Sequence, residues 1–269
     1  MTDDSILKAA AKLGVLGGRA SAAQTLRLLT NPAVSVADVA RSIDQEPTLA
    51  ARVLRVANSA YYGLQREIST VESAAVMLGL DVLRAIAAAA CFDSALMQSR
   101  NSGTTSVEEL RGHCIASAVA ADALARQCHR ELAPTAFMAG LLHDFGILIL
   151  LALEADEGDE GAGQSRPTHE HCAALTFEVW GLPDALVAAA RHHHQPEKSP
   201  EAHRRMAAIV HLADAVAKAS GFGLAVDGPS TIPSQAAAMA VLGLGNDAIT
   251  ELTDALPERV GQLSRALSG

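Results

Sequence analysis

The chain has 269 residues, 49% of them hydrophobic but only 3% aromatic, and its formal net charge is −9. Binding to the phosphate backbone of nucleic acid is therefore not expected over a broad surface, because that binding needs clustered Lys and Arg. The apolar residues are mainly Ala, Leu and Val, and the scarcity of aromatic residues disfavours a sheet. The composition predicts an all-α protein.

Cysteine usage and the absence of an evident signal peptide at the N-terminus favour a cytoplasmic location. None of the four cysteines forms a C-x-x-C pair, so we expect reduced core thiols. The apolar stretch 137–153 contains His143 and Asp144 and is short for a membrane span. We expect it to be a buried core helix, with no membrane association.

Residues 1 to about 100 read as short helices. Ser35 caps one helix, Pro47 lies in the first turn of the next, and Ser69 or Thr70 caps a third that ends at Gly79. A further helix is expected from residue 81 to about 97. These features predict a helical N-terminal unit without a repeat of fixed period.

Polar and glycine-containing segments divide the rest of the chain. The segment 98–106 is the predicted junction, so residues 1–103 form an N-terminal helical subdomain and residues 104–222 a second one. Residues 223–269 are expected to form a C-terminal extension of two short amphipathic helices. Within the second subdomain, the acidic segment 155–168 is predicted to be an exposed loop.

A scattered set of ligand-type residues lies in or beside apolar helical segments. Burying an imidazole or a carboxylate costs several kcal/mol unless the group is paired or bound to a metal. A single His on an apolar helix is more often a satisfied core residue, but together histidines and aspartates suit a divalent transition metal. The candidate ligands are His113, His143, Asp144, His169, His193, His194 and Asp214.

The remaining histidines have simpler interpretations. His192, His129, His171 and His203 are expected at the surface. His211 precedes Asp214 by three residues, on nearly the same helix face, and is interpreted as a packing residue or as a support for a ligand.

The order of the candidate ligands resembles the HD superfamily of metal-dependent phosphohydrolases, and residues 10 to about 220 resemble HDOD-domain proteins. The segments that carry the resemblance are SIDQEPTLAARVLRVANSAYYG, REISTVESAAVMLG, MAGLLHDFGILIL, HEHCAALTFEVWGLP and AAARHHHQPE. The resemblance implies an HD-domain-like helical bundle preceded by an N-terminal helical subdomain.

The resemblance also assigns roles to the candidate ligands. His143 and Asp144 match the HD dipeptide, His113 the upstream histidine, and Asp214 the closing aspartate of the family core. His169 and the pair 193–194 match ligands of a second ion in related two-metal members. The implied cofactor is one or two divalent ions, of Fe, Mn, Zn or Mg, and Asp144 would bridge two ions and be catalytic if the protein is an enzyme.

The chain departs from the cyclic-diguanylate phosphodiesterases of the superfamily in two ways. Ile147 stands where their HD-x-G-K stretch would place a lysine, and no Gly-Tyr-Pro loop follows His194. Lysine supplies compact positive charge for phosphate oxygens. These departures weaken the expectation of catalysis, whereas the expected metal ligands are all present.

Two functions follow from the resemblance. The first is a bacterial signalling or regulatory module without turnover, which acts through a protein partner or a small ligand. The second is a phosphohydrolase for nucleotides or cyclic dinucleotides. For the partner surface, the residues to consider are Asn58, Ser59, Tyr61 and Tyr62, although Asn58 also suits a structural role at a helix end.

Nucleic-acid binding is a third and weaker possibility. It would depend on four arginines of the N-terminal half, for which a solvated face is the simpler explanation: Arg52, Arg55, Arg66 and Arg84.

Overall fold

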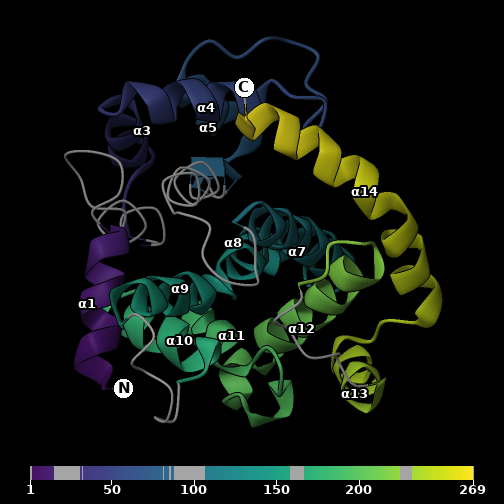
Figure 1. Cartoon of the computed structure of the whole chain (residues 1–269). Helices are drawn as coiled ribbons and strands as arrows, with labels where there is room; N and C mark the ends of the chain where they lie inside the picture. The colour runs from purple at the N-terminus through teal and green to yellow at the C-terminus, as the bar shows by residue number, and fades with distance from the viewer. Residues whose placement is uncertain are drawn as a thin grey trace.

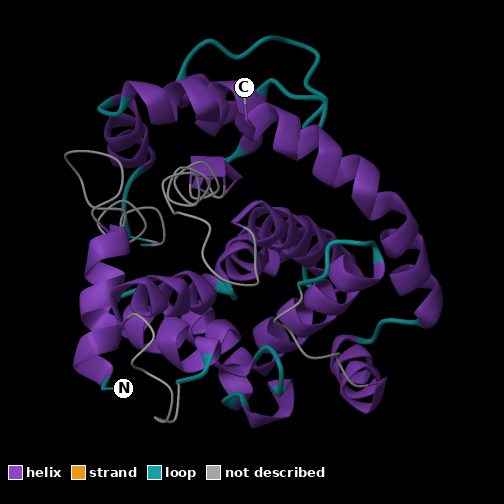
Figure 2. Cartoon of the chain, in the orientation of Figure 1, coloured by secondary structure: helices purple, strands orange, loops and turns teal. Residues whose placement is uncertain are grey.

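A computed structural model describes residues 2–14, 31, 33–80, 82–84, 86–87, 107–157, 167–224 and 232–268. Every regular element in these residues is a helix, as Figure 2 shows. The all-α prediction is confirmed. The predicted junction 98–106, most of the predicted helix 81–97 and most of the predicted loop 155–168 lie outside the described residues.

In the predicted N-terminal subdomain, three short helices pack against one another: α3 (Val36–Asp44), α4 (Pro47–Ala57) and α5 (Val71–Leu78). The side chain of Ser35 accepts a hydrogen bond from the Asp38 backbone, and Thr70 caps α5 in the same way. Gly79 ends α5 with a φ of +88°, which an L side chain rarely adopts. The predicted caps at Ser35 and Thr70 and the predicted end at Gly79 are confirmed.

The predicted second subdomain contains one long helix, α7 (Val107–Cys128), which is buried along most of its length. It packs against α8 and α12, while α10 packs against α9 and α11 (Figure 1). The other helices of this part of the chain are α8 (Ala133–Leu142), α9 (Phe145–Glu157), α10 (His169–Trp180), α11 (Asp184–His192) and α12 (Arg204–Ala219).

The predicted core helix 137–153 is two helices, α8 and α9, which meet at a turn formed by His143 and Asp144. The single-helix prediction was wrong, because apolar sequence on both sides of the turn gives no local sign of a break. The stretch Arg130–Glu154 is long and apolar enough to cross a membrane, but 83% of its most apolar window is buried inside the protein. It is a core element, as predicted.

The terminal helices wrap around this bundle. Helix α1 (Asp3–Gly14) packs on α9 and α10, and α13 (Ile232–Leu242) packs on α12. Helix α14 (Asn246–Ser268) has 23 residues rather than the short length predicted, and it tolerates Pro257 inside it. It contacts α7, α12 and α4, so it runs from the central bundle to the short helices of the N-terminal part (Figure 1).

Candidate metal centre

Four buried side chains from three places in the bundle meet at what we call the first position: His113 of α7, His143 and Asp144 of the α8–α9 turn, and Asp214 of α12. The Nε2 atom of His113 lies 3.3 Å from Asp144 Oδ2 and 3.3 Å from Asp214 Oδ1. The Nε2 atom of His143 lies 3.2 Å from Asp144 Oδ2 and 3.3 Å from His113 Nε2. These donor atoms converge on one small volume.

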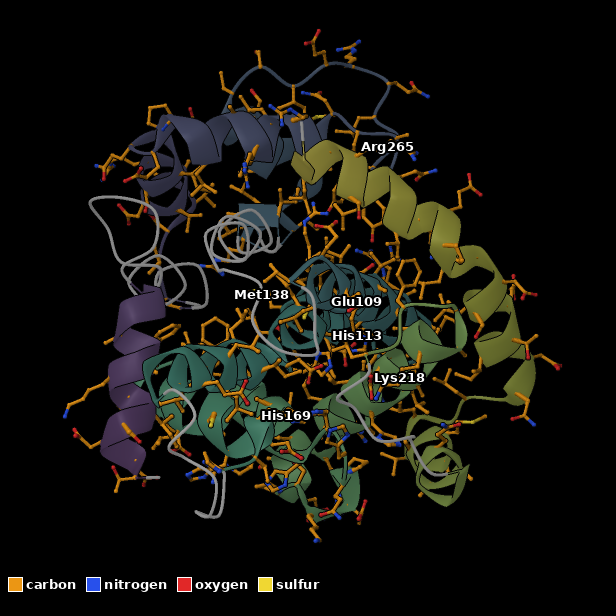
Figure 3. All side chains as sticks on the ribbon, in the orientation of Figure 1. Glu109, His113, Met138, His169, Lys218 and Arg265 are labelled. Carbon is orange, nitrogen blue, oxygen red and sulfur yellow. The ribbon has the colours of Figure 1, made fainter. Side chains whose placement is uncertain are left out.

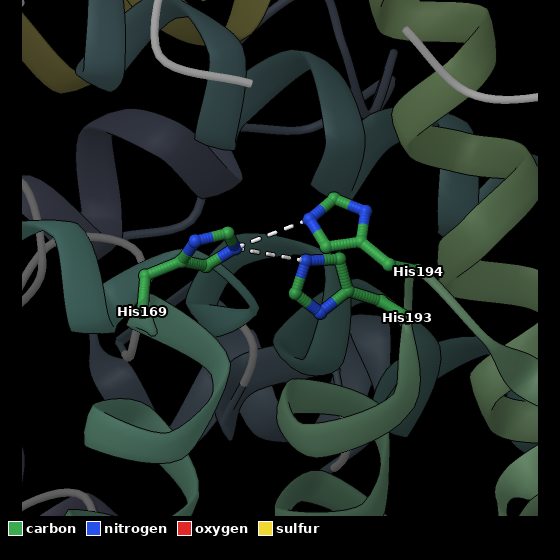
Figure 4. A group of neighbouring side chains, drawn as sticks. All are labelled: His169, His193 and His194. Carbon is green, nitrogen blue, oxygen red and sulfur yellow. Dashed lines mark hydrogen bonds between the residues drawn. The ribbon is translucent and has the colours of Figure 1, made fainter. Parts of the chain in front are cut away.

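Three more imidazoles form a second position beside the first. The Nε2 atom of His169, at the start of α10, lies 3.3 Å from His193 Nε2 and 3.2 Å from His194 Nε2 (Figure 4). The other oxygen of Asp144, Oδ1, lies 3.3 Å from His169 Nε2 and 3.6 Å from His193 Nε2. Asp144 therefore offers one oxygen to each position.

Backbone carbonyl groups fix the orientation of three of the imidazoles. The Nδ1 atom of His113 donates to the Phe222 carbonyl at 2.7 Å, that of His143 to Gly140 at 2.8 Å, and that of His193 to Ala190 at 2.9 Å. A carbonyl oxygen can only accept, so Nδ1 carries the proton in each ring. The Nε2 atom of the neutral ring then keeps its lone pair for a cation.

The buried carboxylate oxygens test whether this donor set fits a metal. Both oxygens of Asp144 and Oδ1 of Asp214 receive no hydrogen bond from the described residues. An ionised carboxylate left in this state is costly. A cation removes this cost, and mixed imidazole and carboxylate ligands suit Zn, Fe or Mn. The residues fit a pair of divalent ions.

Proton affinity differs between the two positions. Burial lowers the pKa of His113, but its contacts with Asp144 and Asp214 outweigh burial and raise this pKa to about 10. Burial lowers the pKa of His193 well below its ordinary value, and the neighbouring His143 and His194 lower it further. A cation that binds Nε2 of His113 must therefore displace a proton, whereas His193 is neutral and its Nε2 atom is free of a proton.

Two glycines permit the close helix approaches that bring the ligands together. A Cβ atom on Gly140 of α8 would lie 2.6 Å from the Ser117 carbonyl oxygen of α7. A Cβ atom on Gly146 of α9 would overlap the carbonyl of His169, the first residue of α10. Glycine at residue 146 thus lets His169 approach the turn that carries Asp144.

Outside the ligand set, two residues support it. The Nζ atom of Lys218, one turn after Asp214, donates to Asp214 Oδ2 at 2.8 Å. The other oxygen, Oδ1, faces His113 (Figure 3 labels His113 and Lys218). His211 donates from Nδ1 to the His193 carbonyl at 2.7 Å, so it supports a ligand, one of its two predicted roles. Lys218 follows Asp214 by four residues on a helix, and this spacing could have predicted their ion pair from the sequence.

Glu170 is a neighbour of the second position that sequence reasoning missed. Its Oε1 atom lies 3.9 Å from His194 Nε2, and its Oε2 atom lies 3.6 Å from His169 Nδ1. Burial raises the pKa of Glu170, but hydrogen bonding from Thr168 and the charge of His169 outweigh it, so the net pKa is lowered. Only its place next to His169 in the sequence could have indicated this role.

The two positions differ in exposure. The ligand side chains of the first position are fully buried, whereas those of His169 and His194 are 17% and 29% exposed. The centre therefore meets solvent at the second position. Of the histidines predicted at the surface, His171 is exposed and pairs with Asp3 of α1 at 3.1 Å, whereas His129, His192 and His203 are half-buried.

Other predicted residues have structural roles. The Asn58 side chain donates to the Leu54 and Ile68 carbonyls and accepts from the Ile68 backbone, so it fastens the end of α4. Tyr61 and Tyr62 pack half-buried against the core. Arg84 is buried and donates to backbone carbonyls, so the expectation that it belongs to a solvated face was wrong.

Comparison with known structures reveals the same fold in several bacterial proteins. An HDOD-domain protein of unknown function from Geobacter sulfurreducens matches with a TM-score of 0.71 and 22% identity, over 98% of this chain and 99% of that one. A Shewanella amazonensis SB2B protein, a phosphohydrolase by name alone, gives 0.68 and 22%, over 98% of each chain. No curated protein matches the sequence.

A longer protein shares the fold as well. A Marinobacter aquaeolei VT8 protein, a signal transduction protein by name alone, gives a TM-score of 0.72 and 24% identity, over 99% of this chain and 65% of that one. At the level of sequence, the HDOD domain family model matches residues 19–196, which is more than half of the chain. The chain belongs to the HDOD domain family.

Proposed function

We propose that this chain is a signalling protein of the HDOD family that has kept a two-metal centre and uses it to hydrolyse a phosphate ester. The substrate class is a nucleotide or a cyclic dinucleotide. The observation that carries the proposal is Asp144, whose two oxygens face two complete sets of imidazole donors. A centre that only stabilised the fold would not need both sets.

The roles of the residues follow from their positions. Two divalent ions at such a centre supply a nucleophile from water near neutral pH and neutralise charge on a phosphate group. Asp144 holds the two positions together, and Asp214, anchored by Lys218, completes the first. A substrate would approach from the side of His169 and His194, where the centre meets solvent.

The signalling part of the proposal rests on relatives and on the exposed face of α5. One relative of the same fold is named a signal transduction protein. Val76 and Met77 of α5 are 78% and 55% exposed, so two large apolar side chains of this helix are accessible to a partner. We propose that a signalling partner binds the N-terminal subdomain through this face.

A second candidate function is regulation without turnover, through the binding of a protein or small ligand. Ile147, where related phosphodiesterases place a lysine, is buried and apolar. Lys218, the cation beside the first position, is already engaged by Asp214. Under this alternative the ions stabilise the bundle or report the presence of a ligand.

Elemental analysis followed by a turnover assay separates the two candidates. The purified protein is loaded with Mn²⁺, Fe²⁺ or Mg²⁺ and assayed on a panel of nucleotides and cyclic dinucleotides. We expect turnover that Asp144→Asn abolishes and that Asp184→Asn, an exposed carboxylate at the start of α11, leaves unchanged. Metal-loaded protein without turnover on every substrate would contradict hydrolysis and favour regulation.

A further inference from the structure

The second position is short of negative charge compared with the first. The first position has two carboxylates, Asp144 and Asp214, whereas the second has three imidazoles and only the shared oxygen of Asp144. Neutral imidazoles do not offset the charge of a divalent ion. A further anionic ligand would therefore be most valuable at the second position.

Glu170 lies where such a ligand is needed. It is the second residue of α10, directly after His169, and its side chain is 22% exposed, like its histidine neighbours. Its Oε1 atom is 3.9 Å from His194 Nε2. Two atoms that each lie about 2.1 Å from one ion can be up to about 4.2 Å apart, so this distance is within reach of shared coordination.

The state of the carboxylate agrees with this role. Its Oε2 atom is buried and receives no hydrogen bond from the described part of the chain. An acidic residue in the first turn of a helix is also favoured by the helix dipole, which contributes about 0.3–1 kcal/mol. The dipole explains the acidic side chain but not its position against two imidazoles of the second position.

We propose that Glu170 is an additional ligand of the second metal ion, on its solvent-facing side. This assignment rests on the proposed two-metal centre and extends it to a ligand outside the HD set. With Glu170 the second position has two carboxylates, as the first has. Additional oxygen ligands favour Mn²⁺ and Fe²⁺ over Zn²⁺ at such a site.

Titration of the metal-free full chain with Mn²⁺ tests the assignment. Equilibrium dialysis gives the number and affinity of the ions, and electron paramagnetic resonance distinguishes a coupled pair from a single ion. In Glu170→Gln we expect the second ion to bind at least about tenfold more weakly and the coupled signal to disappear. Binding of the first ion should stay unchanged, because Glu170 does not reach that position.

Two comparisons make the result specific. Glu178→Gln alters a carboxylate on the same helix that pairs with Arg191 at 2.6 Å, and it should bind both ions like the wild type. If Glu170 only packed against His169, the Gln side chain has the same shape and would keep that contact, so the affinity would be retained. Thermal unfolding without metal verifies that each variant is folded.

The outcomes separate this assignment from the proposed function. Normal binding of both ions by Glu170→Gln would overturn the assignment of Glu170 and leave the two-metal centre intact. A wild-type chain that holds only one ion, or none, would overturn the assignment and the two-metal centre together. Selective loss of the second ion in the variant supports both.

Discussion

The first metal position lies wholly inside the protein, whereas the second reaches the surface. His113 and Asp214 come from α7 and α12, the helices at the centre of the bundle. His169 and His194 come from the start of α10 and the turn after α11, and they are partly exposed. For the proposed two-metal centre, we therefore expect a tightly held inner ion at the first position and a more exchangeable outer ion at the second, where a substrate would meet the centre.

Removal of the shared ligand should produce the largest effect on this comparison. Asp144→Ala takes an oxygen from each position, so we expect both ions to be lost. With metal at about 100 times its dissociation constant, the lost stabilisation is about 3 kcal/mol per independent ion. Elemental analysis and thermal unfolding with and without Mn²⁺ measure the two effects. Retention of either ion by the variant would show that Asp144 is not the shared ligand.

Variants that each remove a ligand from only one position should lose different ions. His113→Ala should lose the inner ion and lower the stability even without metal, by about 3 kcal/mol or more, because it empties a fully buried site and removes the imidazole that lies between Asp144 and Asp214. His194→Ala should lose only the outer ion and cost far less stability. Metal stoichiometry and urea unfolding of both variants test this contrast. Equal loss of both ions in both variants would show a single shared site.

A glycine variant should disturb the outer position through the backbone. Gly146→Ala places a methyl group against the carbonyl of His169, so α10 must shift away from α9. We expect a destabilisation of about 1–3 kcal/mol and weaker binding of the outer ion. Gly112→Ala is the control, because its added methyl group lies 3.8 Å from Phe222 and is accommodated. Unchanged binding of the outer ion in Gly146→Ala would exclude this positioning role.

The smallest expected effect is a pH dependence that distinguishes the positions. The pKa of His113 in the folded, metal-free protein is raised to about 10, so its contribution to stability is complete below about pH 6.5 and is lost as the pH rises through 10. As the pH rises, a smaller fraction of His113 carries the proton that the inner ion must displace. Its affinity should therefore increase with pH more steeply than that of the outer ion.

Anaerobic metal titrations at about pH 6 and pH 9 measure this difference. Thermal unfolding should show a larger stabilisation by metal at the higher pH, because the metal-free protein has lost stability and the ion binds more tightly. Identical pH slopes for the two ions would contradict the different proton affinities of His113 and His193.

Local sequence was sufficient for the fold class and for several helix boundaries. Ser35 and Thr70 cap their helices through hydrogen bonds to residues three positions later, which a sequence pattern can reveal. The break at His143 and Asp144 was not predictable, because the residues on both sides are equally apolar and a continuous helix would bury them as well. Only packing against α7 and α10 selects the turn.

The sequence by itself determined seven candidate ligands, since His and Asp in apolar helices and the resemblance to a family pointed to the side chains that meet in the bundle, but it did not point to Glu170. Tertiary structure decided that Asp144 faces both positions, that Glu170 and Lys218 stand beside them, and that only the second position meets solvent. The physical reason is that distances between atoms of different helices depend on how closely those helices pack. Helices α9 and α10 can pack this closely because Gly146 has no methyl group to meet the backbone of His169. This requirement can be recognised only in the packed structure.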